Sequence, residues 1–239
     1  MHKKGLYEKF IKRPFDFFGS LFALIILSPL ILIIAILVRI KLGYPVIFKQ
    51  KRPGLNNKIF SLYKFRSMTT DKDNTGRLLP DEERMTKFGS FLRATSLDEL
   101  PELFNILKGE MSFVGPRPQL IKDLVFMDTD QILRHSVRPG LTGYAQVNGR
   151  NHMNWETKFD MDIDYVFRIS FFRDIRILLK TIVVILKKEG VNGHGSSTSQ
   201  DFGDYLLQEG KVDSRTYIVK IDEAEKLENG VFKFDDVYR

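Results

Sequence analysis

Two adjacent carboxylates, Asp98 and Glu99, are the side chains of this sequence whose types and spacing best suit chemistry. A purely structural explanation also fits, because Ser96 followed by Glu99 matches the capping box that opens many helices. With Ser96 as the N-cap, however, Pro101 would be the fifth helical residue, where its missing N–H breaks a hydrogen bond. A helix that starts at Asp98 avoids this loss and makes Asp98 the cap. Taken alone, the pair is as consistent with a helix start as with a catalytic centre.

Cationic side chains near turns accompany this pair and favour phosphate chemistry. Several are arginines beside proline or glycine, as in Pro116-Arg117-Pro118, and such arginines can direct a planar fork at phosphate oxygens. Carboxylate and phosphate oxygens are also the ligands that Mg²⁺ prefers. The sequence therefore predicts a diphosphate site with a magnesium ion. Its candidate cations are Lys64, Arg66, Arg93, Arg117, Arg138 and Arg150.

Composition narrows the classes of protein that the chain can belong to. The 239 residues include no cysteine, which excludes a disulfide scaffold, an iron–sulfur cluster and a thiol nucleophile. Four histidines lie far apart, so a zinc site is not expected. The net charge is +7, with −4 on residues 196–239 and +11 on the rest. A basic body suits nucleic acid, anionic lipid or phosphorylated substrates. Basic and aromatic residues do not alternate on one face, so no nucleic-acid partner is expected.

An uncharged run of 22 residues, 17–38, predicts a membrane segment. As a straight helix it would be roughly 33 Å long, enough for a hydrocarbon core of ~30 Å. Ser28-Pro29 lies at its centre, and proline breaks or kinks a helix. Basic residues flank both ends, and positive flanks favour the cytoplasmic side. The residues alone leave two topologies open, a straight span and a re-entrant hairpin broken at Ser28-Pro29.

The remaining pattern predicts a mostly α-helical fold with one small β-hairpin. The segment 171–188 has apolar residues on one side, for which core packing is favoured over an interfacial helix beside the membrane segment. The expected domains are 1–42 (basic N-terminus and membrane helix), 43–195 (catalytic) and 196–239 (acidic appendage). The expected elements are strands 46–50 and 59–65 joined by a turn at 52–57, a loop 70–83, helices 83–92, 98–108 and 120–135, an irregular loop 138–151, two helices within 156–188, and strands 217–221 and 231–234.

Seven short motifs, in order from residue 12, resemble the small monotopic phosphoglycosyl transferases, also called bacterial sugar transferases. The resemblance extends to about residue 195 and does not cover 196–239, for which a structural brace is favoured over a regulatory or partner-binding role. The motifs are Lys12-Arg13-x-x-Asp16, Ser28-Pro29, Arg52-Pro53-Gly54, Lys64-Phe65-Arg66-Ser67-Met68, Leu97-Asp98-Glu99-Leu100, the run from Leu107 through Pro116-Arg117-Pro118, and Arg138-Pro139-Gly140-Leu141-Thr142-Gly143.

The resemblance implies an activity and a location. Such enzymes transfer a sugar-1-phosphate from a UDP-sugar to a polyprenyl (undecaprenyl) phosphate and release UMP, the first membrane step of a bacterial surface glycan pathway. The implied location is the cytoplasmic face of the bacterial inner membrane, with inner-membrane lipid and downstream glycosyltransferases as partners. Ser28-Pro29 matches the break of a re-entrant helix hairpin, so the resemblance favours the hairpin over the span. It names no sugar; loops 69–83 and 138–155 are expected to select it.

The resemblance also implies roles for individual residues. Asp98 matches the nucleophile that forms a covalent phosphosugar intermediate, and Glu99 matches the Mg²⁺ ligand. Lys64 matches a functional lysine, Arg93 a phosphate-binding arginine and Arg117 a nucleotide-sugar contact. Covalent catalysis by a carboxylate divides one difficult displacement into two easier ones.

Overall fold

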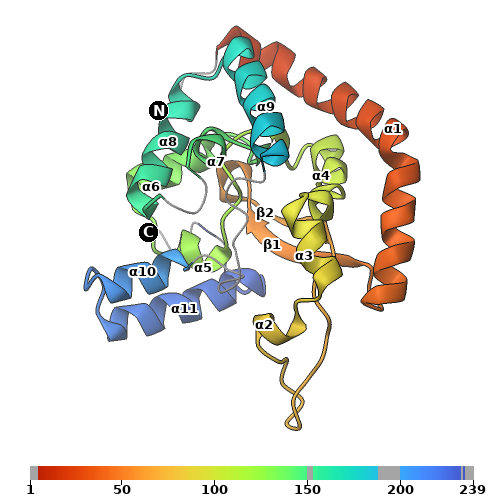
Figure 1. Cartoon of the computed structure of the whole chain (residues 1–239). Helices are drawn as coiled ribbons and strands as arrows, with labels where there is room; N and C mark the ends of the chain where they lie inside the picture. The colour runs from red at the N-terminus through yellow and green to blue at the C-terminus, as the bar shows by residue number, and fades with distance from the viewer. Residues whose placement is uncertain (1–4, 150–152, 188–199, 233, 235–239) are drawn as a thin grey trace.

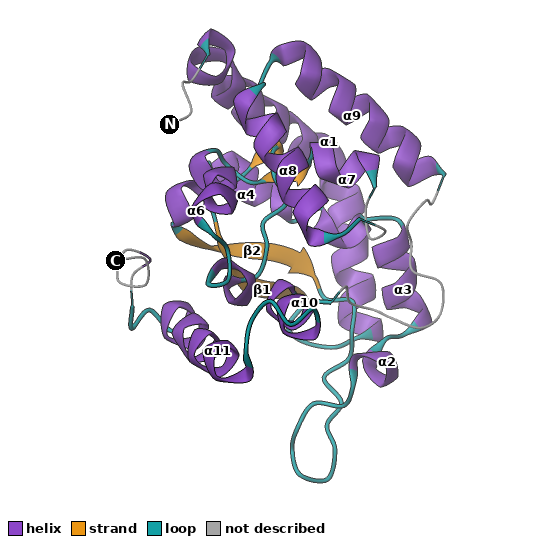
Figure 2. Cartoon of the chain, turned by 90° about the vertical axis from the view of Figure 1, so that its left-hand side faces the viewer, coloured by secondary structure: helices purple, strands orange, loops and turns teal. Residues whose placement is uncertain are grey.

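The described part of the chain consists mostly of helices around two small sheets (Figure 1 and Figure 2). The computed structural model describes residues 5–149, 153–187, 200–232 and 234. The predicted mostly α-helical class with a small hairpin is confirmed. β1 (Ile47–Pro53) pairs antiparallel with β2 (Ile59–Phe65), so that Phe48 lies opposite Lys64. The turn between them contains the 3₁₀ turn η2 (Leu55–Asn57), as its asparagines predicted.

Short helices carry the chain from the hairpin through the carboxylate segment. The predicted polar loop ends at α2, and the predicted helix 83–92 is α3, which begins four residues later with Thr86 as its N-cap. The predicted helix from Asp98 is instead divided into a 3₁₀ turn and α4, because Pro101 lacks an N–H and stands as the N-cap of α4. α4 ends at Gly109, as predicted. The bounds are α2 (Asp81–Arg84), α3 (Lys87–Ala94), η3 (Leu97–Glu99) and α4 (Glu102–Lys108).

A second sheet joins two of the sequence motifs. β3 (Ser112–Val114) pairs parallel with β4 (Gly140–Thr142). The backbones approach so closely that a Cβ on Gly140 would lie 2.1 Å from the N atom of Gly115, which explains the glycines. The prediction of an irregular loop over 138–151 is therefore wrong for much of its length. It contains β4 and α7 (Tyr144–Asn148), while residues 150 and 151 lie outside the described part.

The predicted single helix 120–135 is wrong, and three short helices take its place. The interruption falls at Asp128, whose side chain caps a new helix by accepting hydrogen bonds from the backbone N–H groups of Asp130 and Gln131. The pieces are α5 (Ile121–Leu124), α6 (Thr129–Ile132) and η4 (Leu133–Ser136).

Two longer helices follow, as predicted: α8 (Trp155–Phe167) and α9 (Phe171–Leu186). The favoured core packing of α9 is wrong for most of its apolar side. Only Asp174 and Ile177 of α9 are buried, whereas Phe172 is 83% and Leu186 76% exposed. An exposed apolar face is what an interfacial helix requires.

The C-terminal segment forms two helices, α10 (Phe202–Gln208) and α11 (Ser214–Glu228), at the opposite end of the molecule from α9 (Figure 1 and Figure 2). The predicted strand 217–221 is wrong, because Asp213 caps α11 and the apolar residues recur at helical spacing. Residues 231 and 232 form a bend, not a strand, and 233 lies outside the described part. Phe202 and Leu227 share a core with Trp155 and Phe159, as a structural brace would.

The long apolar helix α1 (Lys12–Lys41) follows a π-helical turn, η1 (Tyr7–Ile11), and curves around one side of the molecule (Figure 1). Among the described residues, 7–41 are the single helical stretch long and apolar enough to cross a membrane. Pro29 cannot donate to the carbonyl of Ile25, and the Ser28 hydroxyl donates to that oxygen instead, at 2.8 Å. The backbone stays helical through Pro29, so the predicted break at Ser28-Pro29 does not divide the helix in two. A return to the same membrane face stays a prediction.

The N-terminal end of α1 docks on the end of α4. The Arg13 guanidinium donates to the carbonyl oxygens of Ile106 at 2.7 Å and Leu107 at 2.8 Å, both in the last turn of α4. Asp16 accepts a hydrogen bond from the Phe113 N–H at 3.0 Å. This motif therefore orients the apolar helix relative to the helix that follows the carboxylate pair.

Candidate active site

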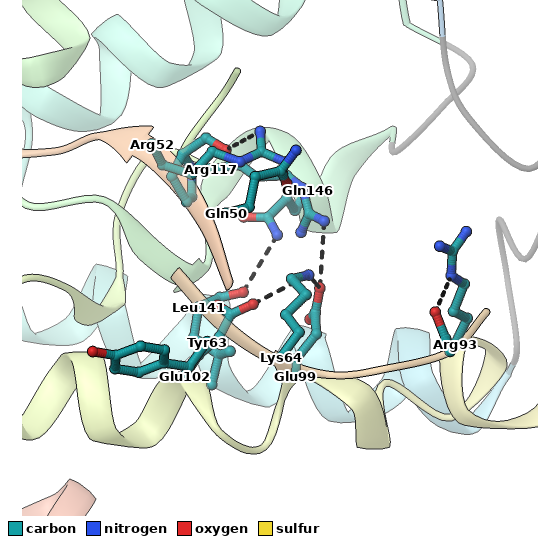
Figure 3. Close-up of polar contacts among 12 residues, drawn as sticks. Gln50, Arg52, Tyr63, Lys64, Arg93, Glu99, Glu102, Arg117, Leu141 and Gln146 are labelled. Atoms are coloured by element: carbon teal, nitrogen blue, oxygen red, sulfur yellow. Dashed lines mark hydrogen bonds and ion pairs between the residues drawn. The ribbon is translucent and has the colours of Figure 1, made fainter. Parts of the chain in front are cut away.

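Lys64, at the end of β2, links the carboxylates of the 3₁₀ turn and α4 (Figure 3). Its ammonium Nζ lies 2.6 Å from Glu99 Oε1 and 3.1 Å from Glu102 Oε1. The Arg117 guanidinium approaches the same Glu99 oxygen at 3.3 Å, and its side chain is 46% exposed. The structure thus brings Lys64, Glu99 and Arg117 together as predicted, and Arg117 remains accessible to a ligand.

The 3₁₀ turn η3 places Asp98 next to this group. Ser96 has a left-handed backbone, with φ 54°, and makes no side-chain capping hydrogen bond. The capping-box explanation is therefore wrong, as Pro101 indicated. Asp98 is not a cap either: it lies inside η3 with 8% of its surface exposed. The pair is consequently not explained by helix capping.

The three carboxyl groups have different proton affinities. Burial, followed by the charge of Glu99, raises the pKa of Asp98 to about 6. Burial and neighbouring Glu99 raise the pKa of Glu102 to about 7, against the opposing effect of Lys64. Burial acts on Glu99 too, but Lys64 and Arg117 outweigh it and hold its pKa at about 2. At neutral pH, Asp98 is ionised, and Lys64, Arg93 and Arg117 act on its charge without forming an ion pair with it in the described part of the chain, as suits a nucleophile.

Two further predicted cations also line the cleft. The Arg93 Nε donates to the Ser67 hydroxyl at 2.9 Å, and Arg93 lies on the far side of Glu99 from Arg117 (Figure 3). This contact is possible because α3 packs tightly on the segment that follows β2: a Cβ on Gly89 would lie 1.8 Å from the carbonyl oxygen of Ser67. Arg66 lines the cleft as well, and its guanidinium donates to the Leu42 carbonyl at 3.3 Å.

Other predicted site residues have structural contacts. The Arg138 Nε donates to the Gly109 carbonyl at 2.8 Å, and Arg138 does not line the cleft. The carbonyl of Pro116 accepts from the Gly140 N–H at 3.0 Å, and that of Pro118 accepts from Arg52. These prolines shape the loop that presents Arg117. Arg150 lies outside the described residues.

The sequence reasoning missed two residues that shape the site. Glu102 is 4% exposed, and its spacing from Asp98 and Glu99, one helical turn on, was a usable signal. Arg134 donates to the backbone carbonyl of Arg117 at 2.7 Å and pairs with buried Asp162 at 2.6 Å. No local pattern distinguishes Arg134 from a surface arginine.

A cleft of about 1850 Å³ connects these residues. Apolar side chains of α1 and α9, such as Leu27, Ile182 and Ile185, line it in one part, and polar ones, such as Gln119 and Lys158, line another. Parts of both loops expected to select the sugar, 69–83 and 138–155, line it too. The cleft can therefore receive an apolar and a polar ligand at one set of carboxylates.

The carboxylates also fit a magnesium ion that arrives with phosphate. Glu99 makes both of its ion pairs through Oε1, which leaves Oε2 available to a cation. No group of three or more ligating side chains occurs in the described ranges. Magnesium sites commonly use only one or two carboxylates together with substrate phosphates.

Comparison with known proteins places the chain in a family. Residues 7–188 match the family model described as bacterial sugar transferase. The uncharacterized sugar transferase EpsL of Bacillus subtilis (strain 168) is 49% identical over 192 residues, which are 80% of this chain and 95% of that protein.

Two similar proteins carry names that state an activity. The undecaprenyl-phosphate galactose phosphotransferase of Salmonella typhimurium is 39% identical over 200 residues, 77% of this chain and 42% of that protein. The UDP-glucose:undecaprenyl-phosphate glucose-1-phosphate transferase of Xanthomonas campestris is 41% identical over 178 residues, 70% of this chain and 37% of that protein. The chain spans less than half the length of these two relatives. It belongs to the bacterial sugar transferase family and is a transferase.

Proposed function

We propose that this chain transfers a sugar-1-phosphate from a UDP-sugar to polyprenyl (undecaprenyl) phosphate, releasing UMP, through a covalent intermediate on Asp98. The observation that carries the proposal is the position of Asp98: a buried carboxylate beside Lys64, Arg93 and Arg117, in a cleft lined by α1 and by polar side chains. The names of the Salmonella and Xanthomonas relatives support the two substrate classes.

In the first step, a carboxylate oxygen of Asp98 attacks the phosphorus that bears the sugar. The bond from this phosphorus to the bridging oxygen breaks, and UMP leaves with the electron pair. Arg117 and Arg93 flank the carboxylates and stabilise charge on the phosphoryl oxygens. Lys64 holds Glu99 in place and balances part of the charge of the carboxylate group.

In the second step, an oxygen of polyprenyl phosphate attacks the same phosphorus and displaces Asp98. The product is a polyprenyl diphosphate sugar, and the carboxylate is restored. Glu99 would hold Mg²⁺, which when bound would neutralise the charge of the diphosphate. One nucleophile thus serves a water-soluble donor and a lipid-borne acceptor in turn.

The same proposal places the chain at the cytoplasmic face of the bacterial inner membrane, with α1 entering and leaving on that face. The exposed apolar surfaces of α1 and α9 and the basic flanks of α1 support this topology. Cysteines introduced at residues 4 and 41 should both be labelled from the cytoplasm only. Labelling of either one from outside would refute the re-entrant hairpin.

The covalent step predicts UMP release without the lipid acceptor. Wild-type protein mixed with a UDP-sugar and Mg²⁺ should release about one UMP per active site and gain the mass of a sugar phosphate. Asp98→Asn should lose more than about 10³-fold in turnover, because the nucleophile is gone. Asp160→Asn, which alters an exposed carboxylate on α8, is the matched control. Wild-type-like turnover by a folded Asp98→Asn protein would exclude the mechanism, and a screen of UDP-sugars would identify the donor.

A further inference from the structure

Arg52, near the end of β1, is a cation in the cleft to which the proposed mechanism gives no role. Its Nη1 donates to the Pro118 carbonyl at 3.2 Å and its Nη2 donates to Gln50 Oε1 at 2.6 Å. Both partners are neutral. A guanidinium has five N–H donors, and the Nε of Arg52 is buried without a hydrogen-bond partner in the described structure. The Arg52 guanidinium is therefore held in place by two hydrogen bonds, while its buried Nε–H lacks one.

Arg52 also has no ion-pair partner among the described residues. Asp123, Glu102 and Asp201 act on its charge from a distance, and the largest effect of any single charged group comes from another cation, Arg117. Burial and the charge of Arg117 lower the pKa of Arg52 to about 10. Two adjacent guanidinium groups repel each other unless an anion lies between or beside them, and a phosphate matches the fork geometry of both.

The position of Arg52 indicates which phosphate. The cations that act most on Asp98 are Lys64, Arg93 and Arg117, whereas Arg52 lies beside Arg117 on the side away from Arg93 (Figure 3). Arg52 therefore lies further from the proposed nucleophile, Asp98, than Arg117 does. In an in-line displacement the leaving oxygen lies opposite the attacking one, so the second phosphate of a diphosphate lies beyond the reacting phosphorus.

We propose that Arg52 and Arg117 together bind the phosphate of the nucleotide that leaves, so that Arg52 is a substrate-binding residue for UMP and its UDP-sugar precursor. The inference rests on the proposed function and deepens it. The lipid phosphate later attacks in line with Asp98, from the position that the leaving oxygen vacates, so it follows UMP into the same part of the cleft.

The test measures four ligands on wild type and on the variants Arg52→Gln and Arg52→Lys. The control variant is Arg215→Gln, which alters an exposed arginine of α11. UMP should inhibit the Arg52→Gln protein about tenfold or more weakly than wild type, because a charge-assisted hydrogen bond to phosphate is lost. Inhibition by uridine, which has no phosphate, should not change. The KM for the UDP-sugar should rise, and the KM for polyprenyl phosphate should rise by no more than that. Arg52→Lys should be intermediate, because it keeps the charge and loses the fork.

A binding measurement separates this inference from the proposed function. UMP should raise the Tm of wild type and of Arg215→Gln, and should raise that of Arg52→Gln much less. Unchanged UMP affinity in Arg52→Gln and Arg52→Lys would overturn the role of Arg52 in an active enzyme. A selective rise in the KM for the lipid would overturn the assignment to the leaving nucleotide. Wild-type protein that binds UMP but shows no transfer would instead refute the proposed function.

Discussion

Two buried charge clusters, each organised around a lysine, differ in how completely their charges are balanced. In the anchor cluster, Lys12 pairs with Asp174 at 2.5 Å, and the hydroxyls of Tyr7 and Tyr165 donate to the same carboxylate at 2.8 and 2.7 Å. One cation and two neutral donors thus balance one carboxylate. This closed arrangement joins the start of α1 to α9, because a buried charge is tolerated only with such partners.

The second cluster, formed by Lys64, Asp98, Glu99, Glu102 and Arg117 in the candidate active site, is not closed. Its three carboxyl groups compete for the cations, and burial gives two of them raised pKa values. Unbalanced charge is costly for a fold and useful for a site that must accept phosphate and metal. The two clusters therefore differ in the completeness of their internal pairing, rather than in burial or charge alone, and we take this difference to separate an anchor from a candidate reactive site.

Removing each lysine in turn should have the largest effect and tests directly whether the two clusters differ in role. Lys12→Met leaves Asp174 charged and buried, so the free energy of unfolding should fall by about 3 kcal/mol or more, while activity per folded molecule is kept. Lys64→Met should lower kcat/KM by about 10²-fold with a smaller loss of stability, since Glu99 keeps Arg117. Thermal unfolding measures the stability of each variant and UMP release measures its activity, both in the same detergent. Equal effects of the two substitutions on stability and on activity would contradict the distinction.

The pH dependence of the rate tests whether protonation of Asp98 controls the reaction. In the proposed mechanism Asp98 attacks only as a carboxylate, and burial followed by the charge of Glu99 raises its pKa to about 6. As pH falls below about 6, kcat/KM should drop by roughly tenfold per unit, because the free enzyme binds a proton at the nucleophile. Rates from pH 4.5 to 8.5 test this. A profile that stays flat down to pH 5 would argue against Asp98 as the titrating nucleophile.

The smallest expected effect concerns Glu102. Its pKa is about 7 in the folded protein and near 4.5 when unfolded. The folded state therefore binds more protons between these values, so its stabilising contribution is full below about pH 4.5 and is lost as pH rises through 7. Glu102→Gln should raise Tm relative to wild type at pH 8 and leave it nearly unchanged at pH 4.5. A lower Tm at pH 8 would show that the ion pair with Lys64 outweighs the burial of the charge.

Local features of the fold could be predicted, and features that depend on distant contacts could not. The hairpin, α8 and α9 follow from short-range apolar patterns and turn residues. The strand expected at 217–221 was wrong, because the Asp213 cap and the helical spacing of the apolar residues outweigh the preference of β-branched residues for strands. Propensity is a weak signal when tertiary packing decides the outcome.

The candidate site shows the same division. Arg117 and Arg138 both stand beside proline, and nothing local distinguishes them, yet Arg117 reaches Glu99 and Arg138 holds the Gly109 carbonyl. Glu102 was detectable from helical spacing, whereas Arg134 was not detectable at all.

The amino-acid sequence alone was enough to find the candidate segment for chemistry, the apolar helix that precedes it and the family resemblance, because these are properties of neighbouring residues. The folded structure was needed to show which cations contact the carboxylates, that Asp98 is not a helix cap, and that Arg117 acts on the charge of Arg52, which has no ion-pair partner of its own among the described residues. The physical reason is that pairing and burial arise between segments far apart in the chain, and these contacts set each group's proton affinity and its access to ligand.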